Sequence, residues 1–378
     1  MIRLSDHFTY GKLLRFTLPS IAMMIFTSIY GVVDGFFVSN FVGKTPFAAV
    51  NFIMPFLMIL GAVGFMFGTG GSALIAKTMG EGKREKAQQL FSLFIYVTLV
   101  CGGVIAVLGI VFIRPIAAAL GAEGAMLEDC VLYGRIILVA LPACMLQYEF
   151  QSFFVTAEKP QLGLVVTAAA GVANMVLDAL LVAVFPLGLV GAAAATAISQ
   201  CVGGLLPLVY FARPNSSLLR LTSTRFDGGA LLRTCTNGSS ELMTNVSMSL
   251  VSMLYNVQLM RYAGENGIAA YGVLMYVNFV FLSTFIGYSV GTAPVVGYHF
   301  GAGNRAELHS LLKRSLIIIG AASVAMLIAA RCWRTPCPCC LWVTTRICWP
   351  SPCGGSGSMP TPSSLPDWPS SAPASSPP

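Results

Sequence analysis

The sequence carries very little charge for its length. Only 10% of its 378 residues are Asp, Glu, Lys or Arg, and 56% are hydrophobic. A soluble domain has about 25% charged residues. The uncharged stretch at residues 90–112 has the length of a helix that crosses about 30 Å of hydrocarbon. So little charge excludes an ordinary soluble protein, and the long apolar runs predict an all-α polytopic membrane protein.

Histidine is scarce, and cysteine forms no pattern in the body of the chain. The three histidines, His7, His299 and His309, fall near the ends of apolar runs. A membrane-embedded acyltransferase needs an intramembrane histidine with a carboxylate or Asn partner, so this enzyme class is a disfavoured alternative. The five cysteines before residue 331 are scattered singly and suggest neither a disulfide nor a metal site. We therefore expect no enzyme, no metal site and no organic cofactor.

Nine segments are predicted to span the bilayer. With the N-terminus in the cytoplasm, the cytoplasmic segments hold 15 Lys and Arg residues and the opposite side holds four. This bias follows the positive-inside rule and predicts a multi-pass protein of the plasma or inner membrane with a cytoplasmic N-terminus. It also accounts for the net charge of +7, so we expect no nucleic-acid partner. The predicted spans are residues 13–40, 47–76, 89–113, 131–156, 161–185, 188–211, 229–260, 268–298 and 310–330.

The sequence matches itself at a shift of 221 residues, which lays residues 41–89 over 262–310. Six spans separate each residue from its partner, and an even number preserves orientation, so the halves are predicted to be parallel repeats. Two intact lobes of six helices would give twelve spans. We predict an N-lobe at 1–212, a cytoplasmic linker at 213–227 and a partial C-lobe at 228–330. The matched pairs include Gly43/Gly264, Gly70/Gly291, Gly80/Gly301, Gly82/Gly303 and Arg84/Arg305.

The composition changes abruptly at residue 331. Residues 331–378 hold all four Trp, 11 of the 21 Pro and six of the 11 Cys. A zinc site is a weak alternative because no His lies nearby and no paired CxxC spacing occurs. A disordered Pro/Ser tail is a second alternative. We favour a frameshift, since reading the tail one base out of register allows an ending FGSGFFTA that resembles FQSFFVTA at residues 150–157. The tail is then predicted to be out of frame and without a fold.

Several short segments carry a family resemblance. Residues 33–38 read VDGFFV and are followed by Gly43 and the triplet Ala48-Ala49-Val50, and residues 68–71 read GTGG. Together with residues 80–84 (GEGKR) and 188–193 (GLVGAA), they resemble the MATE (multidrug and toxic compound extrusion) family over roughly residues 8–330. The resemblance implies a V-shaped pair of six-helix lobes. It further implies export of cationic or amphipathic compounds, driven by entry of Na⁺ or H⁺.

Four polar residues inside predicted spans are the candidate ion-coupling site. Ionisable groups in a span cost about 2.5–3.5 kcal/mol or more and therefore usually serve function. Asn174 and Asp178 lie four residues apart and share a helix face. With Asp34 and Thr196 they offer oxygen ligands for Na⁺, or two crowded carboxylates with raised proton affinity. The resemblance implies the same four positions. The alternative is that the carboxylates hydrogen-bond helix ends near the interface.

A second group is expected to line the substrate cavity: Gln147, Glu149, Glu241 and Asn245. For Glu149 the alternative is an interhelical hydrogen bond. For Glu241 it is a solvated position at a helix start, since residues 237–240 (NGSS) resemble one. The predicted partners are a cationic or amphipathic small molecule and the lipid bilayer, with the protein a monomer. A flippase for lipid-linked sugars is the other transporter alternative, although no intramembrane Lys or Arg marks a cationic cavity. A further alternative is that the chain does not make a working protein.

Overall fold

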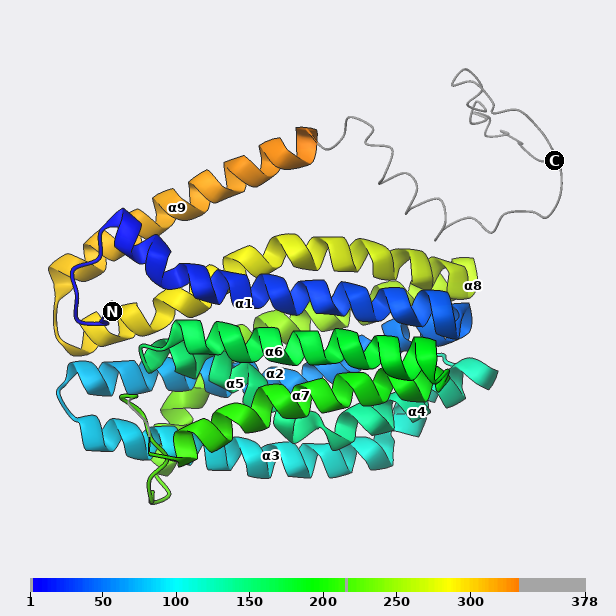
Figure 1. Cartoon of the computed structure of the whole chain (residues 1–378), viewed down its shortest axis with the longest axis horizontal. Coiled ribbons are helices and arrows are strands. Elements are labelled where there is room, and N and C mark those ends of the chain that lie inside the picture. The colour runs from blue at the N-terminus through cyan, green and yellow to red at the C-terminus, as the bar shows by residue number, and fades with distance from the viewer. Residues whose placement is uncertain (1–2, 215–216, 333–378) are drawn as a thin grey trace, which may run out of the picture. The chain divides into compact units, whose positions relative to one another are not determined.

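The computed structural model describes residues 3–214 and 217–332, and over these residues it is all-helical (Figure 1). The predicted all-α class is confirmed. The elements are α1 (Tyr10–Phe37), η1 (Val38–Val42), α2 (Lys44–Gly80), α3 (Arg84–Ala119), α4 (Gly124–Val139), α5 (Leu141–Thr156), α6 (Pro160–Asp178), η2 (Ala179–Val184), α7 (Gly188–Ala212), α8 (Gly228–Gly301) and α9 (Arg305–Cys332), where η1 and η2 are π-helical.

Seven of the described helical segments are long and apolar enough to cross a membrane, and α4 with α5 makes an eighth if this bent pair counts as one span. These eight coincide with eight of the nine predicted spans. The ninth prediction, residues 229–260, is helical and forms the first arm of α8, but it is too polar to qualify by composition. Its many Ser, Thr and Asn side chains lower the hydropathy of this segment.

Two of the spans are bent, and each bend has a local cause. α4 and α5 meet at 59°, and Pro142 stands in the first turn of α5. Proline lacks the N–H of an intrahelical hydrogen bond, which explains the bend at this position. α8 turns back at Gly264, where φ is 61° and ψ is −155°, and this divides it into two antiparallel arms (Figure 1). Pro19 lies inside α1 without ending the helix.

The turns confirm the predicted repeat. α2 ends with Gly82 at φ 81°, and the second arm of α8 ends with Gly303 at φ 68°. Gly82 N donates to Met79 O (2.9 Å) and Lys83 N to Thr78 O (3.1 Å). In the second half, Gly303 N donates to Phe300 O (3.2 Å) and Asn304 N to His299 O (3.0 Å). Both are Schellman caps, and every atom pair is related by the same shift of 221 residues.

The contacts at which helices cross are also related by the 221-residue shift. A Cβ on Gly70 would collide with the Thr234 carbonyl oxygen and lie 2.8 Å from Gly238 N. In the other half, a Cβ on Gly291 would lie 3.0 Å from Thr17 Cγ2. Gly291 is the repeat partner of Gly70, and Thr17 is that of Gly238. The first helix of each half therefore crosses the second helix of the opposite half, so the halves are related by a pseudo-twofold axis.

Two hydrophobic clusters fill the described interior. One contains Phe91, Phe150, Phe153, Phe154 and Phe211, whose rings pack edge-on or stacked across α3, α5 and α7. The other lies mainly among α2, α3, α4 and α7. The aromatic cluster joins α3, α5 and α7.

The segment before α1 ties the two halves together. Leu4 N donates to Glu158 Oε1 (2.7 Å) in the α5–α6 loop. Phe8 N donates to Glu307 Oε1 (2.9 Å) in the first turn of α9, and His7 Nδ1 lies 2.6 Å from Glu307 Oε2. His299 is buried against the Phe8 ring, with ring centroids 6.3 Å apart.

Residues Met1–Leu327 form one compact unit, in which α8 packs most extensively on α2 and next on α1. The second unit, Ile328–Pro378, is described only as far as the end of α9 at Cys332. The predictions for the tail, out of frame and without a fold, therefore lie outside the described residues and stay predictions.

Candidate functional site

The four predicted ion-site residues lie on three neighbouring helices. Asp34 is on α1, Asn174 and Asp178 are on α6, and Thr196 is on α7. All four are buried, with exposed fractions of 6%, 1%, 0% and 8% in that order. α6 packs against both α1 and α7, so the three helices form a continuous wall around these side chains. None of the four side chains faces lipid.

Small residues on α6 and α7 allow the helices to approach. Gly171 lies one turn before Asn174, and a Cβ there would fall 2.9 Å from Cδ1 of Tyr30 on α1. Tyr30 and Gly171 are thus in contact one turn away from Asp34 and Asn174, on the same helix faces. On α7, a Cβ on Gly191 would lie 2.7 Å from the Leu181 carbonyl oxygen. The carboxylates consequently sit at a close three-helix junction.

The polar atoms of the site are largely unsatisfied by the protein. Both carboxylate oxygens of Asp178, Oδ1 of Asp34, both amide atoms of Asn174 and the Thr196 hydroxyl are buried without a hydrogen-bond partner among the described residues. The Thr196 hydroxyl lies beside the Asp34 carboxylate without reaching good hydrogen-bond geometry, and Asp34 and Asp178 are close enough to interact electrostatically. Two buried carboxylates repel each other unless a cation or proton neutralises them.

Each carboxylate is followed by a π-helical segment. η1 begins at Val38, four residues after Asp34, and η2 begins at Ala179, directly after Asp178. The wide turns are closed by bonds five residues apart, from Gly43 N to Val38 O (3.1 Å) and from Phe185 N to Leu180 O (2.9 Å). Single π-helical turns are rare and occur often at functional sites. η1 and η2 also contact each other, so the deformed ends of α1 and α6 form one region.

Sequence reasoning missed Tyr30. Its side chain lies beside that of Gln147 on α5, with Thr27 and Asp34 also nearby. Gln147 in turn packs on α7, since a Cβ on Gly203 would lie 2.6 Å from Gln147 Cδ. The missed signal was spacing: Tyr30 precedes Asp34 by four residues and therefore shares its helix face. Of the four predicted cavity residues, Gln147 is the one that reaches the neighbourhood of Asp34.

Glu149 faces elsewhere. It follows Gln147 by two residues and so points to the opposite side of α5, where it lies beside the Thr98 side chain of α3. It is fully buried, and neither carboxylate oxygen has a hydrogen-bond partner in the described part of the chain. Glu149 therefore does not form, with any described residue, the interhelical hydrogen bond that the sequence suggested as an alternative.

Glu241 and Asn245 lie on the first arm of α8, both half-buried. The suggested helix start at residues 237–240 is wrong, because α8 begins at Gly228 and Asp227 caps it by accepting from Ala230 N (3.0 Å). The small residue at 238 instead permits contact with Met66 of α2. Glu241 is thus inside the helix, and its backbone oxygen accepts from Asn245 Nδ2 (2.9 Å).

The sequence matches a known protein family. The sequence profile of the MatE family matches residues 19–180 and 242–341. The chain is similar to the multidrug export protein MepA of Staphylococcus haemolyticus, at 28% identity over 82% of this chain and 68% of the relative. It is also similar to MepA of Staphylococcus aureus, at 26% identity over 85% of this chain and 71% of the relative.

Solved structures agree at the level of the fold. An outward-facing multidrug resistance MATE family transporter of the MOP superfamily superposes with a TM-score of 0.77 at 22% identity, over 85% of this chain and 72% of that one. A crystal structure of MATE in the straight conformation gives the same TM-score and identity over the same shares. The profile match covers more than half of the chain, and the helices provide several apolar spans. The chain therefore belongs to the MatE family, as a multi-pass transporter of the plasma membrane and not an enzyme.

Proposed function

We propose that this protein is a secondary-active antiporter that exports cationic or amphipathic compounds in exchange for Na⁺ or H⁺. One observation carries the proposal: Asp34 and Asp178 are buried close together on adjacent helices, and Oδ1 of Asp34 and both carboxylate oxygens of Asp178 have no hydrogen-bond partner among the described residues. Charged groups inside the membrane are costly and usually mark an ion pathway. The multidrug export named for the similar MepA proteins supports the cargo class.

The coupling ion would bind among Asp34, Asn174, Asp178 and Thr196. Na⁺ would take oxygen atoms from the two carboxylates, the Asn174 carbonyl and the Thr196 hydroxyl. A proton would instead reside on one carboxyl, which could then donate a hydrogen bond to the other. Either ion removes the repulsion between the two acids. An empty site would favour a different arrangement of α1 and α6.

The π-helical segments and the contacts of α1 supply a route for coupling. A π turn can revert to α-helix with a change of register, which would shift the end of α1 or α6 when the ion leaves. α1 also packs on the second half, since a Cβ on Gly287 of α8 would lie 2.6 Å from Ile21 Cα. Ser28 Oγ further donates to Phe279 O (3.5 Å). A movement of α1 would therefore reach the opposite half.

We also propose how the chain is organised in the membrane. The halves act as an N-lobe at residues 1–212 and a C-lobe starting at 228, joined by a cytoplasmic linker at 213–227. The N-terminus faces the cytoplasm, and the protein works as a monomer. Because residues 331–378 read best in another frame, the chain as written would not couple ion entry to export, whereas a frame-restored form would.

The test is energised efflux of ethidium, a fluorescent cation, from cells or vesicles that hold the frame-restored form. An imposed Na⁺ or pH gradient should drive efflux, and collapsing that gradient should stop it. Efflux that depends on neither gradient would contradict antiport. A matched measurement on the chain as written, at equal membrane level, tests the predicted loss of coupling.

A further inference from the structure

The segment of residues 3–9 lies at the end of the bundle where α2 and the second arm of α8 cross closely. A Cβ on Gly80 would collide with the Tyr298 carbonyl oxygen, and a Cβ on Gly301 would collide with the Lys77 carbonyl oxygen. Gly301 is the repeat partner of Gly80, and Tyr298 is that of Lys77, so the two helices meet symmetrically. Because backbone lies against backbone in this crossing, this end of the bundle is closed.

The segment has one anchor in each half of the protein. In the second half, Phe8 N donates to Glu307 Oε1 of α9 (2.9 Å), and the Phe8 ring is fully buried. In the first half, Leu4 N donates to Glu158 Oε1 in the α5–α6 loop (2.7 Å), and Leu4 is 1% exposed. The chain from Leu4 N to Phe8 N covers at most about 14 Å when fully extended. The halves therefore cannot move far apart at this end unless one anchor opens.

Glu158 has a backbone conformation that favours glycine. Its φ is 57°, and among the described residues it is the one residue other than glycine with a positive φ. Glu158 N donates to Val155 O (3.0 Å) and Lys159 N to Phe154 O (2.9 Å), which forms a Schellman cap at the end of α5. Glycine stands at this position in the Schellman caps of α2 and α8. Glycine would form the turn without strain, so the hydrogen bond to Leu4, and not the turn, accounts for a glutamate here.

The two anchors differ in the number of contacts that hold them. The Glu307 carboxylate accepts from Phe8 N and also lies 2.6 Å from His7 Nδ1. The Phe8 ring packs edge-on against two other rings, which adds apolar contacts to the same anchor. The Glu158 anchor is the hydrogen bond to Leu4 N. Movement of the halves away from each other should therefore break the Glu158 anchor first and leave the Glu307 anchor in place.

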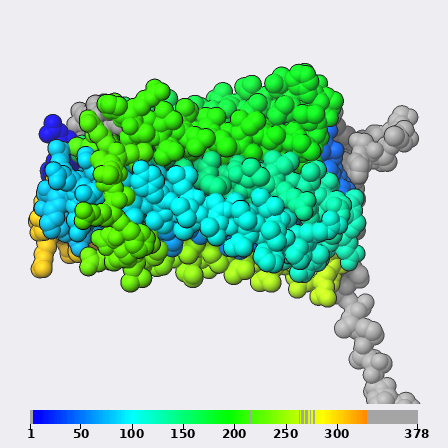
Figure 2. Space-filling view, turned by 90° about the horizontal axis from the view of Figure 1, so that it is seen from below, coloured from blue at the N-terminus to red at the C-terminus, as the bar shows by residue number. Residues whose placement is uncertain are grey.

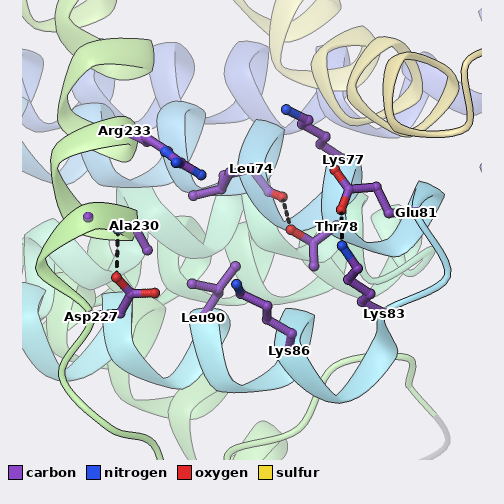
Figure 3. A pocket seen from close by; sticks show the side chains of 11 residues that line it. Leu74, Lys77, Thr78, Glu81, Lys83, Lys86, Leu90, Asp227, Ala230 and Arg233 are labelled. Carbon is purple, nitrogen blue, oxygen red and sulfur yellow. Dashed lines mark hydrogen bonds and ion pairs between the residues drawn. The ribbon is translucent and has the colours of Figure 1, made fainter.

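The first half shows that the fold can leave the equivalent place open. At the 221-residue shift, Phe8 corresponds to Gly229 and Glu307 to Lys86. Gly229 and Lys86 line a pocket of about 220 Å³, which Figure 3 shows, and no aromatic side chain is among the described residues around it. The linker before Gly229 lies along α3 instead, as Figure 2 shows with the linker in green and α3 in cyan. The docking of the N-terminal segment is thus an addition to the repeat and not a requirement of it.

We propose that residues 3–9 are a latch that holds this end of the transporter closed, and that opening begins when Leu4 leaves Glu158. The inference rests on the proposed antiport, because it assigns one step of the transport cycle to this end of the bundle. While Phe8 stays docked on α9, the released residues remain close to the α5–α6 loop and can bind Glu158 again. The latch would therefore bias the two arrangements of the halves without preventing their exchange.

The test measures the separation of the halves at this end in the full chain in detergent. Spin labels on non-natural amino acids at Arg84 and Arg305, two exposed repeat partners in opposite halves, report that distance by double electron–electron resonance. Glu158→Gly keeps the turn but removes the anchor. The ratio of long to short distances should then rise about tenfold, since a hydrogen bond to a charged group contributes on this order. Glu158→Gln, the matched control, retains an oxygen that accepts from Leu4 N and should keep the short distance.

Amide hydrogen exchange of the unaltered chain, read residue by residue by mass spectrometry, tests the order of release without a substitution. The Leu4 amide should exchange faster than the Phe8 amide, because its anchor opens first. Exchange at Leu4 no faster than at Phe8 would overturn that order. Equal distance distributions for Glu158→Gly and Glu158→Gln would overturn the latch itself. Neither measurement depends on transport, whereas a failure of the proposed antiport would appear as ethidium efflux that is independent of both gradients.

Discussion

The crossing of α2 with the first arm of α8 should be intolerant of a single added methyl group. Gly70→Ala places a Cβ against the Thr234 carbonyl oxygen, 2.8 Å from Gly238 N and 3.1 Å from Gly238 Cα. All three are backbone atoms, so the clash cannot be relieved by turning a side chain and the helices must separate. Overpacking of this kind costs about 1–3 kcal/mol, which corresponds to roughly five- to 150-fold in the opening equilibrium of the two helices.

Amide hydrogen exchange of the chain in detergent, read by mass spectrometry, measures that equilibrium. Peptides from residues 66–80 and 228–245 should exchange faster in Gly70→Ala, while peptides from α4 should not change. Gly103→Ala on α3 is the matched control, because no atom lies within 4 Å of the added Cβ and alanine favours the helix. If the two variants exchange alike, the close crossing between the halves does not exist as described.

Further substitutions test the N-terminal segment, Glu149 and the tail. Phe8→Ala empties a fully buried site and should lower the free energy of unfolding by about 3–5 kcal/mol. Phe226→Ala, at a 75% exposed position, should change the free energy of unfolding little. Equal thermal shifts in the two variants would contradict the packing of the N-terminal segment against α8 and α9. Glu149→Gln removes a buried carboxylate whose oxygens have no hydrogen-bond partner in the described part of the chain. The variant should raise thermal stability while leaving ethidium efflux intact, and a loss of efflux would instead place Glu149 in the transport path. Restoring the frame after Ala330 should restore energised efflux at matched membrane levels, and equal efflux from the chain as written would show that the missing spans are dispensable and that transport does not need two complete lobes.

The sequence predicted the repeat and the helical class well because both depend on periodic, local information. The 221-residue shift located equivalent turns, such as those at Gly82 and Gly303, before any contact was known. The polarity of residues 229–260 was harder to judge, since helix formation there depends on contacts with α2. One interpretation of the sequence placed a helix start at residues 237–240, although α8 begins at Gly228. The error arose because the small residues around Gly238 are compatible with a helix start as well as with a close helix crossing.

The candidate site was predictable only in part. Asp34, Asn174, Asp178 and Thr196 stand out because polar residues are rare in apolar helices. Their grouping on three adjacent helices is a property of packing, to which Gly171 contributes. Tyr30 was overlooked because an aromatic residue in an apolar helix carries no signal of its own. The attachment of the N-terminal segment to Glu307 joins residues about 300 positions apart, which no local pattern indicates.

The proposed binding of the coupling ion by the buried carboxylate pair is tested by gradient-driven ethidium transport. The variant is Asp34→Asn in the frame-restored form, and the exposed Glu128→Gln is a matched acid-to-amide control. We expect Asp34→Asn to insert normally and still bind ethidium, yet to show no transport driven by Na⁺ or H⁺, while Glu128→Gln transports like the unaltered form. Full gradient-driven transport by Asp34→Asn would contradict the proposed binding.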